Sequence, residues 1–128
     1  MARNRAKAAT VAGFKVRSGL EATVIEAARQ YGDIEYETEK LWYSSPYTPD
    51  CKLPNGILIE IKGYFTAKDR AKMVKVIRDN PDRDIRMVFQ ANNKIHRKSD
   101  MRYANWCNKR DIPYAIGGIP SDWFEEEA

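Results

Sequence analysis

The chain has 128 residues, with 22 Lys and Arg against 18 Asp and Glu, and this length suits a single domain with a modest core. A content of 43% hydrophobic and 31% charged residues excludes disordered and fibrous classes, and two cysteines with one histidine are too few for a disulfide scaffold or a zinc finger. No apolar run approaches the ~20 residues of a membrane helix, and the first 17 residues contain no signal-peptide core, so we expect a cytoplasmic protein with no membrane contact.

The net charge of +4 is unevenly distributed along the chain. Residues 1–17 carry five basic residues and no acid, and residues 62–110 carry fourteen Lys and Arg against five Asp and Glu. We therefore predict a flexible basic arm over residues 1–16, one domain over residues 17–124 and an acidic tail over residues 125–128. Two basic segments are typical of a polyanion-binding protein, although a solvated surface also explains such runs.

The first helix is predicted to begin after Ser18. Ser18 and Glu21 have the spacing of a capping box, and Gly32 is a stop signal. The apolar face of this helix is formed by Leu20, Val24, Ile25 and Ala28. On these residues alone, Glu21 is better explained as part of the helix cap than as a catalytic group.

Strands are predicted to follow this helix. Residues 34–39 alternate with period two, which predicts a strand with one acidic, solvent-facing side. Residues 41–49 are aromatic and contain two prolines, as in an extended connector. Residues 48–53 and 57–62 are predicted to be strands joined at Pro54-Asn55-Gly56.

Helices and strands alternate in the second half of the chain. A helix is predicted over residues 66–80, with Met73, Val74 and Ile77 inside, and a strand over residues 85–89. After a basic loop, Asp100 is predicted to cap a helix that runs to about Arg110 with Tyr103, Trp106 and Cys107 as core residues. A strand at 113–116 and a helical turn at 121–123 complete an α/β fold in which helices flank a mixed sheet.

The predicted hairpin at residues 48–62 concentrates charged residues. Leu58, Glu60 and Lys62 share one face of the second strand, and Ile57, Ile59 and Ile61 form the other, which must be core. Pro54 and Gly56 favour a three-residue turn that pairs Lys52 with Leu58 and brings Asp50 opposite Glu60, with Cβ atoms ~5 Å apart. A two-residue turn at Asn55-Gly56 would instead point Asp50 away from Glu60.

Two carboxylates this close repel each other unless a cation lies between them. Hard oxygen ligands suit Mg²⁺ or Mn²⁺, and the Ile61 carbonyl is a plausible further ligand. Lys62 beside such a metal can orient or help deprotonate a water molecule, or stabilise charge in the transition state. The residues Asp50, Glu60 and Lys62 therefore predict metal-assisted phosphodiester hydrolysis, while a turn aspartate and an exposed Glu-x-Lys face remain the alternative.

The remaining chemically distinctive residues are predicted to have ordinary roles. His96 is expected to be a loop residue near DNA rather than a base or ligand. The three tryptophans are expected to pack rather than to stack on bases, and both cysteines to be reduced thiols; these residues are Trp42, Trp106, Trp123, Cys51 and Cys107.

These motifs resemble two nested groups of proteins. Pro49-Asp50 followed by Glu60-Ile61-Lys62 resembles the metal-dependent nuclease superfamily named for its Pro-Asp…Asp/Glu-x-Lys motif. Further segments between about Phe14 and Trp123 resemble, in the same order, the phage endonuclease I family of Holliday-junction resolvases. They are Arg17-Ser18-Gly19-Leu20-Glu21, Tyr47-Thr48-Pro49-Asp50, Leu53-Pro54-Asn55-Gly56-Ile57, Lys62-Gly63, Asp84-Ile85-Arg86 with Val88-Phe89, and Ile119-Pro120 with Trp123.

The resemblance implies a restriction-endonuclease-like core in an intertwined, segment-exchanged homodimer. It implies Mg²⁺- or Mn²⁺-dependent resolution of four-way junctions and branched DNA, with no nucleotide cofactor. The family's site residues fall on Glu21, Asp50, Glu60 and Lys62, with Glu21 supplied by the partner chain and added to the metal ligands. The connector before Tyr47 is several residues shorter than is typical of the family.

Basic residues on two parts of the chain are the candidate phosphate contacts, which position DNA without reading its sequence. They are Arg3, Arg5, Lys7, Lys15, Arg17, Lys68, Arg70, Lys72, Lys75, Lys94, Arg97 and Lys98. Two alternatives stay open: a related nuclease that acts on linear DNA, and a non-catalytic DNA-binding module.

Overall fold

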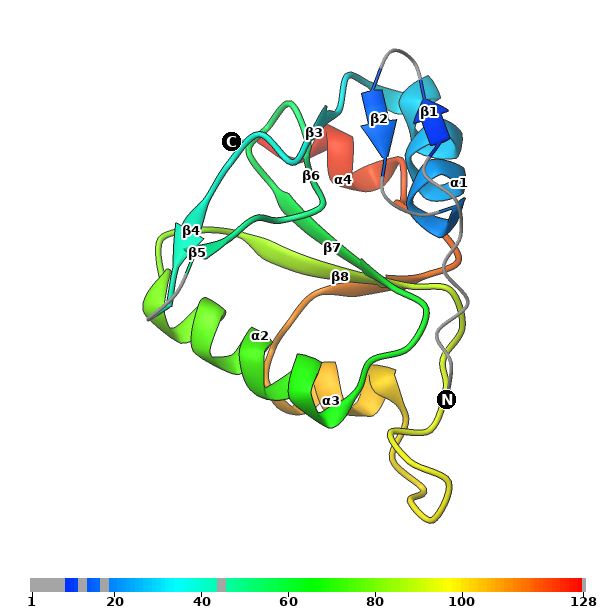
Figure 1. Cartoon of the computed structure of the whole chain (residues 1–128), viewed down its shortest axis with the longest axis vertical. Helices are drawn as coiled ribbons and strands as arrows, with labels where there is room; N and C mark the ends of the chain where they lie inside the picture. Colours follow the sequence, from blue (N-terminus) through cyan, green and yellow to red (C-terminus); the bar gives the residue numbers. More distant parts are fainter. Residues whose placement is uncertain (1–8, 12–13, 17–18, 44–45, 128) are drawn as a thin grey trace.

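The computed structural model describes residues 9–11, 14–16, 19–43 and 46–127, with backbone only for the first two ranges. Its centre is a five-stranded sheet in the order β3-β6-β7-β8-β9 (Figure 1). The strands are β3 (Glu35–Tyr36), β6 (Cys51–Lys52), β7 (Leu58–Lys62), β8 (Ile85–Phe89) and β9 (Tyr114–Ile116). β3, β6 and β7 pair antiparallel, whereas β7, β8 and β9 pair parallel, so the predicted mixed sheet is confirmed.

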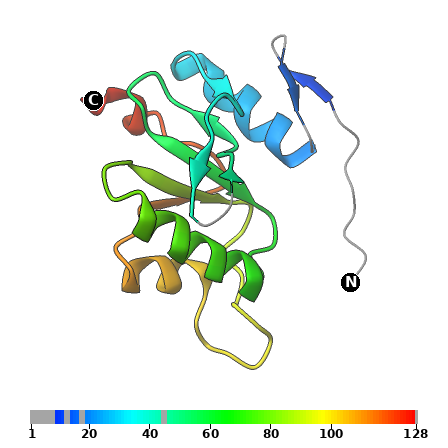
Figure 2. The ribbon, with the colours of Figure 1, turned by 60° about the vertical axis from the view of Figure 1, so that its left-hand side comes forward.

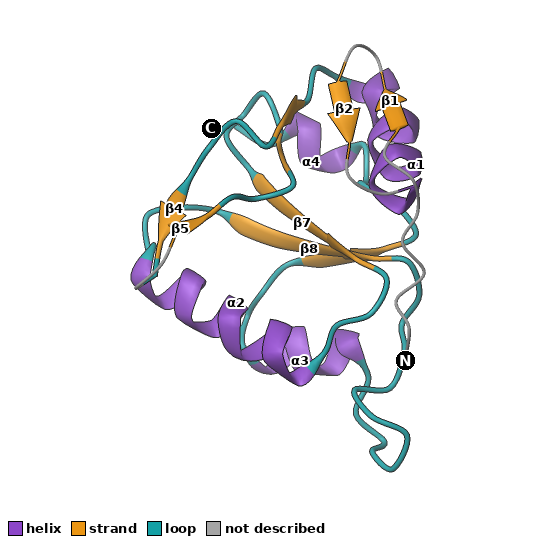
Figure 3. Cartoon of the chain, in the orientation of Figure 1, coloured by secondary structure: helices purple, strands orange, loops and turns teal. Residues whose placement is uncertain are grey.

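Helices lie on both faces of the sheet, which gives three layers (Figure 3). α1 (Gly19–Ala28) and α4 (Asp122–Glu125) lie on one side, and α2 (Ala67–Asp79) and α3 (Tyr103–Lys109) on the other. A short 3₁₀ helix, η1 (Arg29–Tyr31), continues α1. Among the described residues, no helix has both the length and the apolar character needed to cross a bilayer.

The two faces of β7 contribute to separate cores. Ile59 and Ile61 pack with α1, as the sequence predicts for the isoleucine face. Leu58, on the same face as Glu60, is buried in the core beneath α2 and α3, where Phe65 packs edge-on against Trp106 with ring centroids 5.0 Å apart. β7 is therefore a central strand with no solvent-facing side.

The boundaries of α2 follow from its capping residues. The Thr66 side chain accepts a hydrogen bond from the Asp69 N–H, and the Asp69 carboxylate accepts one from the Thr66 N–H, which forms a capping box. Met73 is buried as predicted, but Val74 is 39% exposed and Val76 takes the inward position. The prediction for Val74 is wrong because residues three apart, such as Met73 and Val76, share the helix face that packs on the sheet, and Val74 lies off that face.

α3 begins later than predicted. Its N-cap is Arg102, and Asp100 is exposed outside the helix. Two groups of the preceding loop accept hydrogen bonds from the first amides: the Asn92 side chain from the Ala104 N–H, and the Asn93 carbonyl from the Tyr103 N–H. The preceding loop therefore replaces Asp100 as the source of capping groups, while the predicted core residues of this helix are buried.

Two short strands lie within residues 1–16, the segment predicted to be a flexible basic arm. β1 (Ala9–Val11) and β2 (Phe14–Val16) form an antiparallel pair, as their β-branched and aromatic residues favour. The predicted helix cap, Ser18, lies outside the described residues, as do residues 1–8 of the predicted arm. The apolar face of α1 is confirmed, with Val24, Ile25 and Ala28 buried.

The predicted connector contains a short hairpin. β4 (Leu41–Trp42) pairs antiparallel with β5 (Pro46–Tyr47), and the Trp42 carbonyl accepts a hydrogen bond of 3.0 Å from the Asn80 side chain at the end of α2. Leu41 and Tyr47 are buried, whereas Trp42 is 64% exposed. The packing prediction is therefore wrong for Trp42, because the edge pairing points this side chain away from the core.

Arg86 binds the carboxyl-terminal end of the described chain to the sheet through hydrogen bonds. Its guanidinium forms two hydrogen bonds to Asp84, at 2.8 and 2.7 Å, and two to Glu126, both at 2.7 Å. The same group lies over the Trp123 ring, 5.0 Å from its centroid, which is a packing role for this tryptophan. Glu126, within the acidic tail, is thus bound to β8.

An ion-pair network joins the predicted strand at 34–39 to two later segments. The Glu39 carboxylate forms two hydrogen bonds with Arg83, and Lys52 lies 2.9 Å from Glu39 and 3.4 Å from Glu35. The hydrogen bond from Arg83 lowers the pKa of Glu39 to about 2, assisted by Lys52 and opposed by partial burial.

This network predicts an acid-dependent loss of stability. A lowered pKa in the folded state means that ionised Glu39 stabilises the fold above the unfolded-state pKa of 4.5, and that this contribution is lost as the pH falls towards 2. We expect Glu39→Gln to lower the free energy of unfolding at neutral pH by about 1 kcal/mol after allowance for solvent screening. Urea denaturation of both proteins at neutral and acidic pH measures this difference in the free energy of unfolding. The difference should vanish as the pH approaches the folded-state pKa of about 2.

The matched control is Glu26→Gln, which neutralises an exposed acid of α1. This variant should follow the wild type across the pH range. A constant difference between Glu39→Gln and the wild type at every pH would contradict the assignment.

Candidate metal centre

The hairpin of β6 and β7 has the register predicted from its turn. Cys51 pairs with Ile59 and Lys52 with Leu58. The Leu53 N–H donates to the Ile57 carbonyl at 2.9 Å, and Gly56 has a φ of 92°, a left-handed conformation that glycine adopts without strain. The three-residue turn is confirmed, and the two-residue alternative is excluded.

This register brings Asp50 alongside β7. One step beyond the Cys51 pair, the Asp50 Oδ2 atom accepts a hydrogen bond of 2.7 Å from the Ile61 N–H. Asp50 is 3% exposed. A carboxylate that immediately precedes the strand is therefore held against the backbone of the residue next to Glu60.

Glu60 lies in the middle of β7 and is 6% exposed. The Tyr47 hydroxyl donates a hydrogen bond of 2.7 Å to its Oε1 atom, and the Lys62 Nζ atom lies 3.4 Å from its Oε2 atom. Lys62 is also 3.5 Å from the Asp69 carboxylate at the start of α2. Glu60 and Lys62 are thus neighbours on one face, as their spacing predicts.

Glu21 approaches the site from α1 on the other side of the sheet. It is 8% exposed, and its Oε2 atom accepts a hydrogen bond of 2.7 Å from the Tyr36 hydroxyl of β3. A carboxylate oxygen of Glu21 lies within 4.8 Å of one from Asp50 and one from Glu37. The Glu21 side chain therefore reaches Asp50, which a role confined to the helix cap does not require.

Glu37 is the acidic residue that sequence reasoning missed. Period-two alternation assigns it to the solvent-facing side with Glu35 and Glu39, but Glu37 has a φ of 48°. This left-handed conformation, uncommon for a residue other than glycine, ends β3 at Tyr36 and breaks the alternation. The carboxylate of Glu37 consequently joins Glu21 and Asp50, while Glu35 and Glu39 bind Lys52.

Burial and mutual repulsion dominate the electrostatics of this cluster. The pKa of Asp50 is raised well above its usual value, first by burial and then by the charges of Glu60 and Glu21. The pKa of Glu60 is raised by burial, against the opposing effect of Lys62 and of the Tyr47 hydroxyl. Burial and the neighbouring Glu60 also raise the pKa of Tyr47, so its hydroxyl keeps its proton.

These residues fit a divalent cation. The grouped donor atoms, from Glu21, Glu37 and Asp50, are all carboxylate oxygens, which are the ligands of hard cations. A dication would replace the repulsion between Asp50, Glu60 and Glu21 by attraction. The Ile61 N–H binds Asp50, so the backbone of this residue lies beside the acidic side chains.

The predicted phosphate contacts fall into three sets. Lys68, Lys75, Lys94, Arg97 and Lys98 are exposed. Arg70 is engaged with the Phe65 carbonyl at 2.7 Å, and Lys72 lies over the Tyr47 ring, 4.9 Å from its centroid. Arg3, Arg5, Lys7 and Arg17 lie outside the described residues, and Lys15 is described only by its backbone in β2.

Three of the exposed residues lie on one projecting loop. Lys94, Arg97 and Lys98 belong to the segment between β8 and α3, drawn in yellow at the lower edge of Figure 2. The loop is closed at its base by a hydrogen bond of 2.9 Å from the Ile95 N–H to the Met101 carbonyl. His96 is exposed on the same loop, away from the acidic cluster, as expected for a loop residue.

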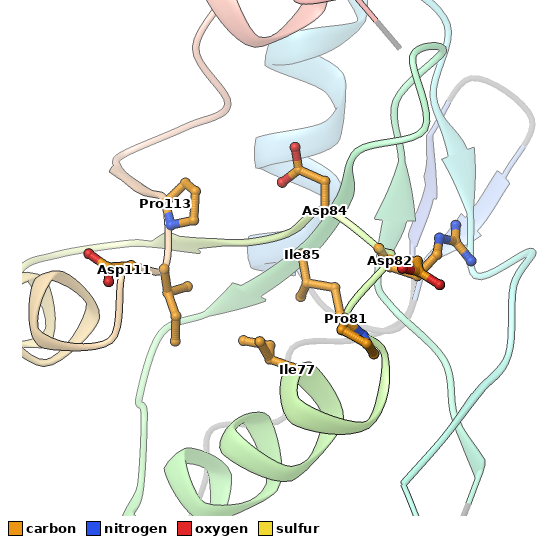
Figure 4. A pocket seen from close by; sticks show the side chains of 9 residues that line it. Ile77, Pro81, Asp82, Asp84, Ile85, Asp111 and Pro113 are labelled. Atoms are coloured by element: carbon orange, nitrogen blue, oxygen red, sulfur yellow. The ribbon is translucent and has the colours of Figure 1, made fainter.

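A cavity of about 420 Å³ lies at another place in the fold (Figure 4). It opens between the end of α2 and the beginning of β8, with Ile77, Pro81, Ile85 and Pro113 among its lining residues. β7 carries both Glu60 and Lys62, at its third and last residues, whereas the cavity adjoins the beginning of the neighbouring parallel strand β8. The concave feature and the acidic cluster are therefore separate.

Comparison with known proteins gives concordant matches. The family model described as phage endonuclease I matches residues 1–128. Endonuclease I of Escherichia phage T7 is 38% identical over 117 residues, which are 86% of this chain and 78% of that protein. Endodeoxyribonuclease 1 of Enterobacteria phage T3 is 38% identical over 115 residues, which are 84% of this chain and 76% of that protein.

The raised pKa of Asp50 predicts a variant that is more stable than the wild type without metal. Because the folded-state pKa lies above 3.8, ionising Asp50 destabilises the fold as the pH rises through that value. Asp50→Asn removes the charge and keeps an oxygen for the Ile61 N–H. In chelator at neutral pH, we expect it to raise the free energy of unfolding by about 1–2 kcal/mol.

The advantage should disappear below about pH 4, where the wild-type carboxyl is protonated in both states. Thermal and urea denaturation in chelator measure it. Asp82→Asn, at an exposed acid, is the control and should match the wild type. An Asp50→Asn protein less stable than the wild type at neutral pH would refute the electrostatic interpretation.

Proposed function

Because the chain belongs to the phage endonuclease I family, we propose that it is a DNA endonuclease that resolves four-way junctions and other branched DNA by metal-dependent phosphodiester hydrolysis. The observation that carries this proposal is the buried carboxylate cluster beside Lys62. Asp50 and Glu60 are almost fully buried at one hairpin, and a Glu21 carboxylate oxygen from α1 lies within 4.8 Å of one from Asp50. Charged groups gathered at such cost in desolvation are typical of a functional site.

The cation of this site is proposed to be Mg²⁺ or Mn²⁺. Asp50, Glu60 and the Ile61 carbonyl would hold it, with Glu21 as a further ligand. When bound, the cation would lower the pKa of a water molecule and polarise the scissile phosphate. The chain itself supplies the fixed carboxylates and excludes most of the surrounding water by burying them.

Lys62 is proposed to assist the hydrolysis. Its ammonium group lies between the Glu60 and Asp69 carboxylates, at 3.4 and 3.5 Å, and these two contacts restrain it beside the site. From there it can orient the attacking water or stabilise the negative charge that develops on the phosphate. Loss of this group should reduce turnover more than metal binding.

DNA is proposed to contact the basic residues around the site. The exposed set on α2 and on the projecting loop, together with the basic residues of the first 17 positions, offers phosphate contacts. These contacts position DNA without reading its sequence. Selectivity for branched DNA would then come from the shape and spacing of two sites in a dimer.

The dimer is proposed to be a homodimer with exchanged segments. α1 and β3 precede the β4–β5 hairpin and pack on strands that follow it, with Tyr36 paired to Cys51. The same contacts can form between two chains when this hairpin opens into a bridge, which is the principle of segment exchange. Glu21 of one chain would then complete the site that contains Asp50 of the other.

The first experiment is a cleavage assay on a four-way junction and a linear duplex of matching sequence. With Mg²⁺ we expect the wild type to cut the junction preferentially, and with chelator not at all. Asp50→Asn and Glu60→Gln should lose cleavage by at least about a hundredfold because each removes a metal-binding charge, while junction binding in Ca²⁺ or chelator is retained.

The outcomes separate the candidate functions. Preferential cutting of the linear duplex would favour a related nuclease with another substrate. Metal-independent binding with no cleavage of any DNA would favour a non-catalytic DNA-binding module. Cleavage of the junction by Asp50→Asn at the wild-type rate would refute the site assignment.

The second experiment tests the exchange by complementation. In an exchanged dimer of one Glu21→Gln chain and one Asp50→Asn chain, one site carries both substitutions and the other carries neither. Refolding the two inactive proteins together should therefore restore nicking of the junction. With closed, unexchanged chains each site keeps one substitution, and the mixture should stay as inactive as either parent.

A further inference from the structure

We propose that the hydroxyl groups of Tyr47 and Tyr36 are positioning groups, each of which orients one glutamate of the metal centre. This inference rests on the proposed function, because it assigns the supporting residues of that site. Both tyrosines are uncharged and lie beside the charged residues of the site. Each is buried and donates a hydrogen bond of 2.7 Å to a different site carboxylate.

Tyr47 determines how the Glu60 carboxylate is turned. Its hydroxyl binds Oε1, while Oε2 is the oxygen that faces the Lys62 ammonium at 3.4 Å. The two contacts occupy opposite oxygens, so together they fix the terminal torsion of Glu60, which is otherwise broad. The Glu60 carboxylate is thereby held in one orientation by a contact at each oxygen.

The position of Tyr47 is itself restrained. Its backbone pairs with Leu41 in the β4–β5 hairpin, and its ring lies in the core under the Lys72 ammonium, 4.9 Å from the ring centroid. A side chain held at both its backbone and its ring loses little further freedom when its hydroxyl donates a hydrogen bond. Such a donor can keep a carboxylate in one orientation before the metal arrives.

Tyr36 has the same relation to Glu21. Its backbone pairs with Cys51 in the sheet, its ring lies in the core with α1, and its hydroxyl binds Oε2 of Glu21. Glu21 comes from a helix, and Asp50 from the residue before β6. The Tyr36 contact therefore orients the one proposed ligand that comes from a helix and not from the β6–β7 hairpin.

The choice of tyrosine as the donor has a physical reason. A further lysine or arginine in place of either tyrosine would also hold a carboxylate, but it would add positive charge beside the dication. A neutral hydroxyl orients the carboxylate and leaves the negative charge of the cluster available. Two identical donors on the two glutamates indicate a shared role rather than incidental packing.

The two pairs are independent of the proposed exchange. Glu21 and Tyr36 both precede the β4–β5 connection between residues 42 and 46, whereas Tyr47 and Glu60 both follow it. Each tyrosine therefore stays with its own glutamate whether the site is built from one chain or from two. This makes the inference testable without knowledge of the dimer.

The experiment compares Tyr47→Phe and Tyr36→Phe with the control Tyr103→Phe. Each substitution removes one buried hydroxyl and keeps the ring. The Tyr103 hydroxyl accepts a hydrogen bond of 3.1 Å from the Phe65 N–H and touches no site carboxylate. The readouts are Mn²⁺ affinity by calorimetry on the DNA-free protein, thermal stability in chelator, junction affinity in chelator, and cleavage rate against Mn²⁺ concentration.

We expect Tyr47→Phe to weaken Mn²⁺ binding by about tenfold or more, as for other groups that orient metal ligands, and Tyr36→Phe to do so to a similar or smaller extent. Excess Mn²⁺ should restore most of the cleavage by Tyr47→Phe but none by Glu60→Gln. Tyr103→Phe should lose thermal stability while keeping wild-type Mn²⁺ affinity, and junction affinity should be unchanged in all three.

Wild-type Mn²⁺ affinity in both Tyr47→Phe and Tyr36→Phe, in a wild-type protein that binds Mn²⁺ and cleaves, would overturn this inference alone. Equal losses of Mn²⁺ affinity in Tyr103→Phe and Tyr47→Phe would also overturn it, because the effect would then be general destabilisation. A wild type that neither binds Mn²⁺ nor cleaves DNA would overturn the proposed function, and this inference with it.

Discussion

The Ile61 N–H donates to the Asp50 carboxylate over 2.7 Å, and this hydrogen bond couples the acidic cluster to the middle of the sheet. Asp50 lies outside the ladder, one residue before β6, so its position depends on the register of the β6–β7 hairpin. That register brings it to the backbone next to Glu60. Strand pairing, and not a loop, therefore positions these two carboxylates, which are ten residues apart in the sequence.

The same arrangement means that the ionised carboxylates lower the stability of the folded state. β7 is covered on both faces, so the charge of Glu60 is desolvated together with that of Asp50. The buried Arg86 carries its charge at much lower cost because two carboxylates surround it. For Glu60, the Lys62 ammonium at 3.4 Å offsets only part of the effect of burial, and the pKa of this carboxyl remains raised. A bound cation can offset this free-energy cost of burying ionised carboxylates.

Much of the fold and the centre of the site could be predicted from local patterns. Proline and glycine in the turn determined the register of Asp50, and the isoleucine alternation identified one of the two buried faces of β7. Patterns failed where a residue left the regular conformation or where a distant segment intervened. Glu37 turned inward through a positive φ, and Asn92 supplied the capping oxygen expected from Asp100. Neither event leaves a signature within a few residues of sequence.

The tyrosine contacts were beyond sequence reasoning for a related reason. A tyrosine in an aromatic connector and another in a short strand look like packing residues, and their rings do pack. Only the three-dimensional structure shows where the two hydroxyl groups end. Composition and periodicity can predict that a tyrosine ring is buried. They do not predict which group its hydroxyl binds.

The turn at Pro54-Asn55-Gly56 has a consequence for how this chain can vary. A single inserted or deleted residue there would exchange the two faces of one strand relative to the other, and Asp50 would face the wrong side of the sheet. The loop between β8 and α3 carries no such restriction, since its length does not determine a strand register. Natural length variation is therefore expected to accumulate in the projecting loop, while the smallest turn of the molecule keeps a constant number of residues.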